Sequence, residues 1–150
     1  MSLREKRLMS ELKSLTQKTP DLIKIVKTEN LMTWLIEITG AEKTLYEDET
    51  YTLQFRFDTE YPLKPPEVVF LQESPVHPHI YSNGHICLDI LDESWTPALT
   101  VESVLLSLIS MMSSCKKKER PPDDSSYVRA WKKNKFSPKK TKWFFHDNKV

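Results

Sequence analysis

One stretch of the chain reads His77-Pro78-His79-Ile80-Tyr81-Ser82-Asn83-Gly84-His85-Ile86-Cys87-Leu88. It contains three of the four histidines, one of the two glycines and one of the two cysteines. Imidazole and thiol groups can transfer protons, bind metals or attack carbonyl carbons, whereas proline and Asn-Gly pairs shape turns. We therefore predict that this stretch is a shaped loop that carries chemistry, and that the flanking segments form the fold around it.

The loop could be a metal site, because His77, His79, His85 and Cys87 are four potential zinc ligands within eleven residues. Structural zinc sites usually take their ligands from two separate segments, and side chains this close together on one strand or tight loop would seldom converge on one ion. Neither a metal nor another cofactor is therefore expected.

The two cysteines differ in their setting. A free cysteine is most often a buried structural thiol, and this interpretation stays open for Cys87. Cys87 follows the turn formed by residues 82–84, however, and lies near a loop end where a thiol can be reached. Cys115 has no comparable setting and is predicted to be structural. Because the chain has only two cysteines and no export signal, we expect free thiols rather than a disulfide.

The segments before the loop predict one helix followed by four strands. Ser2 and Glu5 have the spacing of a capping box, and apolar side chains recur at helical intervals to about residue 17. Apolar and polar side chains then alternate, as in an antiparallel sheet with one face in water. Short connections between the strands favour a meander. The predicted strands cover residues 22–27, 32–39, 51–57 and 68–71.

Two helices are predicted after the loop. Thr100 is a candidate N-cap for a buried helix of about a dozen residues, which should cross the dry face of the sheet. Asp123 or Asp124 is a candidate cap for a shorter helix. We expect a single α+β catalytic domain over residues 1–134 and a basic, aromatic, partly flexible tail over residues 135–150.

Charge is unevenly distributed along the chain, although the formal net charge is only +1. Residues 1–115 carry 10 basic and 17 acidic side chains, whereas residues 116–150 carry 12 basic and 4 acidic ones. The basic end could bind nucleic acid, because clustered lysines release counterions from phosphate. Such ends are commonly just solvated, so nucleic acid is an alternative rather than the expected partner.

Composition also excludes several classes of protein. The two glycines are too few for a P-loop or a dinucleotide fingerprint, both of which need clustered glycines. No apolar stretch resembles a signal peptide or is long enough to span a bilayer. We therefore expect a protein with no membrane partner, located in the cytoplasm and able to enter the nucleus.

The loop resembles the active-site loop of the ubiquitin-conjugating enzymes, in which His-Pro-Asn, a turn with Asn-Gly, and Ile-Cys-Leu follow one another. The corresponding residues here are His77-Pro78-His79, Asn83-Gly84 and Ile86-Cys87-Leu88. The resemblance extends to Tyr61-Pro62, Pro65-Pro66, Trp95, Pro97 and Ala98. It implies the ubiquitin-conjugating (UBC) fold, with an N-terminal helix, a four-stranded antiparallel meander, a central helix packed on the sheet and a shortened C-terminal helical region.

One departure from the family pattern is His79, which stands where asparagine is usual. This histidine, with the tail residues Lys139 to Trp143 and His146-Asp147, is similar to the W type of the family, which attaches ubiquitin to the α-amino group of protein N-termini. The resemblance therefore implies an enzyme that carries ubiquitin as a thioester on Cys87 and transfers it to amines, preferring N-termini. The family asparagine supports the loop or stabilises an oxyanion, and His79 could donate one N–H instead.

The resemblance also implies which residues form the active site. Asp89 and Asp124 are expected near the incoming amine, although Asp124 could instead be solvated or cap a helix. Ser125 follows Asp124 where many members of the family have proline. The residues expected to be catalytic are Cys87, His79, Asp89, Asp124 and Asn83.

Partners follow from the same resemblance. They are ubiquitin, the activating enzyme that consumes ATP upstream, RING or U-box ligases, and protein substrates with accessible N-termini. Leu63 replaces a more usual phenylalanine on the ligase surface, which would narrow the choice of ligase. A catalytically inactive ubiquitin-binding module is the alternative within this fold. The residues expected to contact the ligase are Leu63, Pro97, Ala98, Lys6 and Arg7.

Overall fold

The computed structural model describes residues 1–135, and residues 136–150 lie outside the described part of the chain. The predicted tail, including Trp143 and His146, falls almost entirely in that outer part. Along the described chain the elements are α1 (Leu3–Gln17), β1 (Ile23–Lys27), β2 (Thr33–Thr39), β3 (Thr50–Arg56), β4 (Glu67–Phe70), the 3-10 turn η1 (Asp89–Leu91), α2 (Val101–Ser113) and α3 (Asp124–Asn134).

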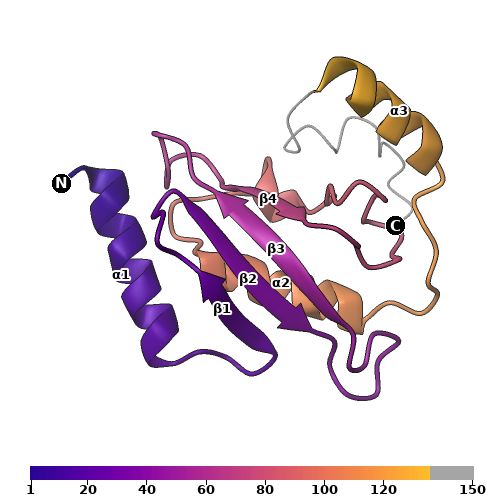
Figure 1. Cartoon of the computed structure of the whole chain (residues 1–150), viewed down its shortest axis with the longest axis horizontal. Helices are drawn as coiled ribbons and strands as arrows, with labels where there is room; N and C mark the ends of the chain where they lie inside the picture. Colours follow the sequence, from indigo (N-terminus) through magenta and orange to yellow (C-terminus); the bar gives the residue numbers. More distant parts are fainter. Residues whose placement is uncertain (136–150) are drawn as a thin grey trace.

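The four strands form one antiparallel meander in the order β1-β2-β3-β4 (Figure 1). Cross-strand pairs on the inner face are apolar: Ile36 lies opposite Leu53, and Phe55 lies opposite both Trp34 and Val68. Alternate residues of β2 are accordingly buried, as the two-residue period of a strand requires. The predicted strands are therefore confirmed, with ends within one residue of those observed.

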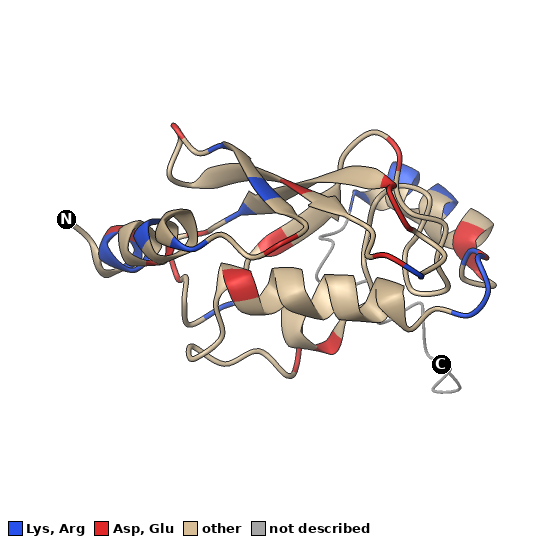
Figure 2. Cartoon of the chain, turned by 90° about the horizontal axis from the view of Figure 1, so that it is seen from below, with Lys and Arg blue, Asp and Glu red and all other residues tan. Residues whose placement is uncertain are grey.

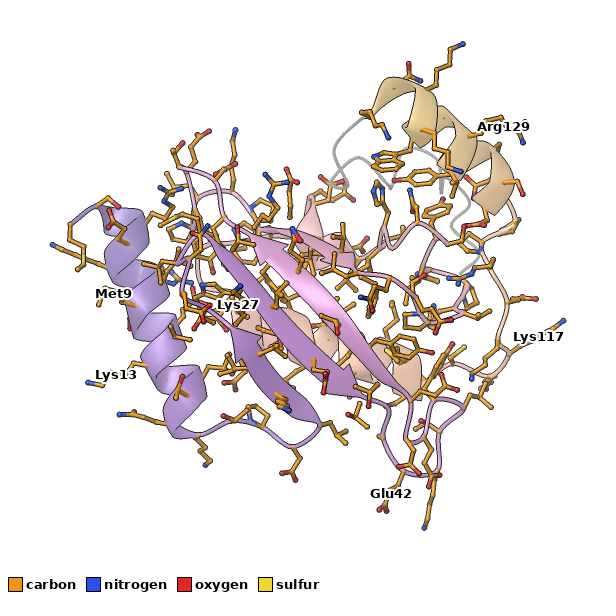
Figure 3. The ribbon with its side chains drawn as sticks, in the orientation of Figure 1. Met9, Lys13, Lys27, Glu42, Lys117 and Arg129 are labelled. Atoms are coloured by element: carbon orange, nitrogen blue, oxygen red, sulfur yellow. The ribbon has the colours of Figure 1, made fainter. Side chains whose placement is uncertain are left out.

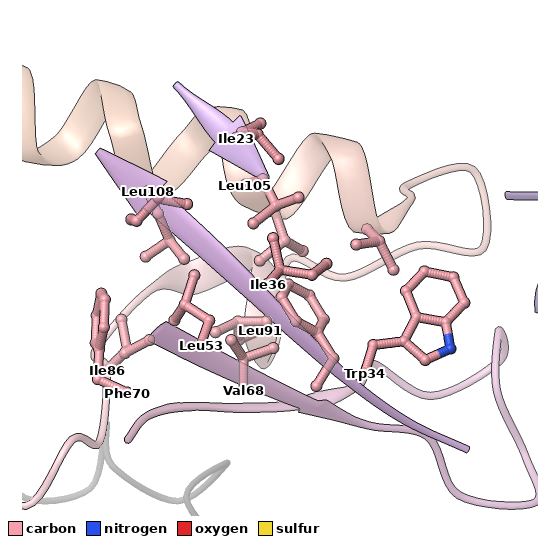
Figure 4. Close-up of a cluster of buried hydrophobic side chains, with 14 of the residues drawn as sticks. Ile23, Trp34, Ile36, Leu53, Val68, Phe70, Ile86, Leu91, Leu105 and Leu108 are labelled. Atoms are coloured by element: carbon pink, nitrogen blue, oxygen red, sulfur yellow. The ribbon is translucent and has the colours of Figure 1, made fainter. Parts of the chain in front are cut away.

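Helix α2 crosses the inner face of the sheet, and α1 and α3 lie at opposite ends of it (Figure 2). The apolar side of α2 fills the core together with the sheet, for example through Leu105 and Leu108, which are fully buried (Figure 4). Thr100 caps α2 as predicted, since its hydroxyl accepts a hydrogen bond from the backbone N–H of Ser103 at 3.1 Å. The α+β fold expected from the sequence is confirmed.

Helix α1 begins with the predicted capping box. The Ser2 hydroxyl accepts a hydrogen bond from the Glu5 N–H at 3.1 Å, and the Ser2 N–H donates to the Glu5 carboxylate at 3.3 Å. Both local partners satisfy N–H groups that the helix itself leaves unpaired. Among residues 1–135, no helix has the length and apolar character needed to cross a membrane.

Helix α3 begins where the sequence predicts, but no side chain caps it. Asp123 stands at the cap position, but its side chain makes no capping hydrogen bond. The Asp123 carboxylate instead accepts a hydrogen bond from the Tyr81 hydroxyl of the loop, and the Asp124 carboxylate accepts one from the Ser82 N–H. The predicted cap position is therefore confirmed for Asp123, but the expected capping hydrogen bond is absent, because contacts with a distant part of the chain replace the local one.

Candidate active site

The loop that contains Cys87 folds back on itself as a short hairpin. The Cys87 N–H donates to the His79 carbonyl at 2.8 Å, and the Tyr81 N–H donates to the His85 carbonyl at 2.9 Å. These bonds place His79 directly beside Cys87, whose side chain is partly buried. The hairpin therefore presents a thiol and an imidazole next to one another at the edge of the fold.

Gly84 is required at the hairpin turn. Its φ of +92° lies in a region that other residues rarely adopt, and an added Cβ would meet the Phe70 carbonyl oxygen at 2.2 Å. The Gly84 carbonyl in turn accepts a hydrogen bond from the Phe70 N–H at 3.0 Å. The Asn-Gly pair predicted to form a turn thus also lets the loop lie directly against the last strand.

His79 is held by the hairpin on both sides. Its backbone N–H donates to Nδ1 of His77 at 2.9 Å, and its ring hydrogen-bonds to the backbone of Cys87. Burial lowers the pKa of His79, while the bond to Cys87 and the negative charge of Asp89 oppose this shift. His79 is therefore a neutral imidazole whose ring is bonded to the backbone of the residue that carries the thiol.

His77 is buried, with 4% of its surface exposed, and was not expected to contribute to the site. Because its Nδ1 accepts the His79 N–H, its Nε2 must carry the proton, and Nε2 donates to the Met111 carbonyl near the end of α2 at 3.2 Å. His77 therefore ties the loop to the central helix. This contact spans 34 residues, so the sequence pattern did not indicate it.

His85 is likewise buried, and its Nδ1 lies 2.6 Å from the Tyr127 hydroxyl of α3. Its ring also meets the Trp131 ring edge-on, with the centroids 5.2 Å apart. His77 and His85 are thus both occupied by protein partners. In the part of the chain that the structure describes, no cluster of three or more histidine, cysteine or acidic side chains could hold a metal ion.

Helix α3 is fastened to the loop by a series of polar and aromatic contacts. The Tyr81 hydroxyl donates to the Asp123 carboxylate at 3.0 Å, and both the N–H and the hydroxyl of Ser82 donate to Asp124 at 2.8 Å. The rings of Tyr81 and Tyr127 stack with centroids 3.8 Å apart. Cys87 packs against this pair, so α3 forms one wall of its surroundings.

The remaining predicted site residues lie on the same loop or directly after it. Asp89 is exposed in the first turn of η1, close enough to His79 to affect its pKa. The Asn83 side chain accepts a hydrogen bond from the His85 N–H at 3.2 Å, as expected of an asparagine that shapes a turn. The structure thus gathers the five expected catalytic residues around one hairpin.

The predicted ligase surface is built from two adjacent loops. Leu63 is 69% exposed, and Pro97 and Ala98 are exposed on the other loop. The indole N–H of Trp95 donates to the Pro62 carbonyl at 2.9 Å, which joins the two loops. An exposed leucine beside exposed proline and alanine is an apolar patch suited to a protein partner.

Lys6 and Arg7 of α1 differ from each other in exposure. Lys6 is exposed, whereas Arg7 is partly buried and donates to the Leu99 carbonyl at 2.7 Å and to the Glu11 carboxylate at 2.7 Å. Arg7 is thus already engaged within the protein, and it holds α1 against the loop that carries Ala98.

Glu11 is a buried carboxylate that joins three segments. It accepts hydrogen bonds from the Tyr61 hydroxyl at 2.6 Å, from the Val101 N–H at 2.8 Å and from Arg7. Val101 is the first residue of α2, so the negative charge also lies at the positive end of that helix. Glu11 therefore fixes α1, the Tyr61 turn and α2 relative to one another.

Replacing Glu11 with alanine should lower the free energy of unfolding by about 2–4 kcal/mol, because it leaves buried donors without an acceptor. Urea denaturation followed by circular dichroism measures this change. The matched control is Glu60→Ala, since the ion pair of Glu60 with Lys64 is exposed and its loss should matter far less. Equal effects of the two variants would contradict the role given to Glu11.

Stability should fall as the pH drops from about 6.5, the usual histidine pKa, towards about 4. Burial lowers the pKa of both His77 and His85 to about 4, so in this window the unfolded chain binds protons that the folded chain does not. Urea titrations at a series of pH values measure the slope. It should be shallower in His85→Gln, and a flat profile between pH 7 and pH 5 would contradict this expectation.

The chain belongs to the ubiquitin-conjugating enzyme family, whose pattern matches residues 7–144. It is 52% identical over 149 residues to ubiquitin-conjugating enzyme E2 W of Caenorhabditis elegans, with 97% of this chain and 96% of the relative covered. It is 51% identical over 152 residues to probable ubiquitin-conjugating enzyme E2 W-A of Danio rerio, with 99% of both chains covered. The resemblance to the W type is therefore confirmed.

The fold agrees with these relatives. The crystal structure of ubiquitin conjugating enzyme E2 UbcA1 from Agrocybe aegerita superimposes with a TM-score of 0.84 at 46% identity, covering 86% of this chain and 95% of the other. The chain is thus a ubiquitin-conjugating enzyme with the UBC fold. Such an enzyme works with ubiquitin, an activating enzyme and ubiquitin ligases.

Proposed function

We propose that Cys87 carries ubiquitin as a thioester and that the enzyme transfers it preferentially to the α-amino group of protein N-termini. The observation that carries the first part is the hairpin, which holds the partly buried thiol of Cys87 beside His79. Cys115 lies in a different setting, with its sulfur hydrogen-bonded to the Tyr46 hydroxyl at 3.4 Å and to the Lys117 carbonyl at 3.3 Å. Cys87 is therefore the better candidate nucleophile.

Two acyl transfers make up the proposed reaction. The Cys87 thiolate attacks the thioester carbonyl at the ubiquitin C-terminus, forming a new C–S bond while the bond to the sulfur of the activating enzyme breaks. ATP is consumed before this step, by the activating enzyme. The acceptor amine then attacks the new thioester, the C–N bond forms, Cys87 leaves as thiolate, and the amine loses a proton.

The acidity of the acceptor supports a preference for N-termini. With pKa values near 7.8 for an α-amine and 10.4 for lysine, about 30% of the former and about 0.1% of the latter is free base at about pH 7.4. The weaker nucleophilicity of the less basic amine offsets part of this advantage. A site that offers little help in removing a proton would still favour the α-amine.

The geometry around Cys87 fits such a site. Both oxygens of Asp124, a carboxylate expected near the incoming amine, are hydrogen-bonded to Ser82. The His79 ring is hydrogen-bonded to the Cys87 backbone, and burial lowers its pKa, which makes the imidazole a weaker base. We infer that His79 mainly positions Cys87, and that neither group is as available for taking a proton from lysine as an unbonded base would be.

Replacing His79 with asparagine should raise the rate of transfer to free lysine. An asparagine restores the family pattern, so the variant should accept lysine more readily. The increase should be about fivefold, because a change of about 1 kcal/mol in the barrier changes a rate by about that factor. Discharge of the preformed thioester by lysine, and by a peptide without lysine that has a free N-terminus, measures the two rates. An unchanged ratio of these rates would remove His79 as the residue that sets the preference.

The same proposal assigns the exposed patch of Leu63, Pro97 and Ala98 to binding a RING or U-box ligase, together with Lys6 and Arg7 of α1. Leu63→Ala should reduce stimulation by a ligase without reducing thioester formation, because Leu63 belongs to the apolar patch and not to the Cys87 hairpin.

The test of the enzymatic function is a reaction of the whole chain with activating enzyme, ATP and ubiquitin on a non-reducing gel. A thiol-sensitive adduct is expected, and no adduct would favour an inactive binding module.

A further inference from the structure

Arg120 lies between α2 and α3 and reaches the segment that leads into the Cys87 hairpin. Its Nη1 donates to the Pro75 carbonyl at 2.8 Å and to the Ser74 hydroxyl at 3.1 Å, and the Ile80 carbonyl shares these hydrogens at 3.2 Å. Its Nη2 donates to the Ser74 carbonyl at 3.1 Å. Each of these acceptors is an uncharged oxygen, so the partly buried guanidinium acts as a fork of hydrogen-bond donors.

The guanidinium thereby fixes the first arm of the hairpin. It holds Ile80 directly, and the buried Ser74 extends the contact, because its hydroxyl donates to the Tyr81 carbonyl at 3.1 Å. Ile80 and Tyr81 come directly after His79 in the chain. The His79 carbonyl accepts the Cys87 N–H, so a shift of this arm would move His79 relative to the thiol.

The same arginine also begins the segment that places Asp124. Pro121-Pro122 follow it, and proline rings fix the backbone φ angle, so the connection is stiff. The Asp124 N–H donates to the Pro121 carbonyl at 3.0 Å, and the Asp124 carboxylate accepts hydrogen bonds from Ser82. The segment 120–124 is therefore fastened to the hairpin at both ends, by Arg120 on Ile80 and by Asp124 on Ser82.

We propose that Arg120 is a positioning residue for the transfer of ubiquitin from Cys87 to the acceptor amine. This role rests on the proposed function, because it takes Cys87 as the site of the thioester. Arg120 acts through the hairpin, by holding His79 beside the thiol and Asp124 at the edge of the site. Displacement of a reacting group by about 1 Å can slow a reaction about a hundredfold. Charging of Cys87 is less sensitive, because it needs the thiol but brings no amine past Asp124.

Arg120→Gln should separate the two acyl transfers. The whole chain is charged with activating enzyme, ATP and ubiquitin, charging is stopped, and the thioester is discharged by a peptide that has a free N-terminus and no lysine. Charging should stay within about twofold of the wild-type rate, whereas discharge should slow by about ten- to a hundredfold. All variants are compared at a temperature where circular dichroism shows them fully folded.

Discharge of the charged variant at the wild-type rate would overturn the role of Arg120. Equal slowing of charging and discharge would overturn it too, because that pattern indicates general damage to the fold. A wild-type chain that forms no thioester would instead reject the proposed function of Cys87, and the two failures are therefore distinguishable.

Two further variants make the test specific. Arg120→Lys keeps the charge and some of the donors but lacks the planar fork, so discharge should slow by only about two- to fivefold. This variant also replaces Arg120→Gln if the glutamine variant does not fold. The matched control is Lys117→Gln, because Lys117 belongs to the same segment and its side chain is 80% exposed and points away from the body of the protein (Figure 3). Discharge slowed as much by Lys117→Gln as by Arg120→Gln would mean that the charge of the segment matters rather than the fork.

Hydrogen exchange of the uncharged enzyme tests the positioning without any transfer chemistry. The amide protons of Cys87 and Ser82, which are hydrogen-bonded at the hairpin, should exchange at least about tenfold faster in Arg120→Gln. Amide protons in the core of α2, such as that of Leu108, should be accelerated far less. Uniform acceleration would indicate a loss of global stability, and no acceleration would mean that the hairpin does not depend on Arg120. Either result would contradict the proposed role.

Discussion

Cys87→Ser should convert the thiol-sensitive ubiquitin adduct into an ester that survives reducing agent. A serine hydroxyl can occupy the place of the thiol beside His79, but an oxygen ester reacts far less readily with amines than a thioester does. Transfer to an acceptor amine should therefore fall by more than about a thousandfold, as is usual when a catalytic nucleophile is removed. Reducing and non-reducing gels of the charging reaction measure both effects.

Cys115→Ser is the matched control, because it removes the other thiol of the chain. Cys115 is hydrogen-bonded to the Tyr46 hydroxyl and lies in the segment that follows α2. Loss of its thiol should therefore leave the adduct and the transfer intact. If the Cys115 variant instead lost the adduct while the adduct of the Cys87 variant remained sensitive to thiol, the assignment of the nucleophile would be reversed.

Acetylation of an acceptor protein at its N-terminus should lower its modification by at least about tenfold, because the α-amine carries most of the free base available at neutral pH. The acceptor should be a protein with an accessible N-terminus and several surface lysines. Intact mass spectrometry of the acceptor, with the ligase present at a fixed concentration, gives the fraction modified over time.

The reciprocal acceptor keeps a free N-terminus and has every lysine replaced by arginine. It should be modified about as fast as the original protein. Rapid modification of the acetylated acceptor, together with little modification of the lysine-free one, would show that lysine is the target and would withdraw the proposed preference without affecting the thioester.

Elements encoded by short-range patterns could be predicted from the sequence. The capping box of Ser2 and Glu5 and the Thr100 cap of α2 depend on residues three apart, and both occur as expected. Alternation along β2 and β3 predicted which side chains point inward. The start of α3 was also predicted, but the partners of its aspartates were not, because the Asp123 and Asp124 carboxylates accept hydrogen bonds from residues 42 positions away rather than from their own helix.

The active-site residues likewise include some that a local motif identifies and some that it does not. Cys87 and His79 were found through the motif that contains them, and the hairpin brings them together over eight residues. His77, Glu11 and Tyr127 were missed because their partners lie 34 to 90 positions away in the sequence. A buried histidine or glutamate gives no local pattern that identifies such a partner.

The central claim is that Cys87 is the point of attachment of ubiquitin, and it is tested most directly by locating the bond. The whole chain is charged with activating enzyme, ATP and ubiquitin, and the intact adduct is then weighed and digested under acidic, non-reducing conditions. The account predicts a mass increase of one ubiquitin minus one water, lost on adding thiol, with the modified peptide containing Cys87. An adduct that resists thiol, or one that maps to Cys115 or to a lysine, would contradict it.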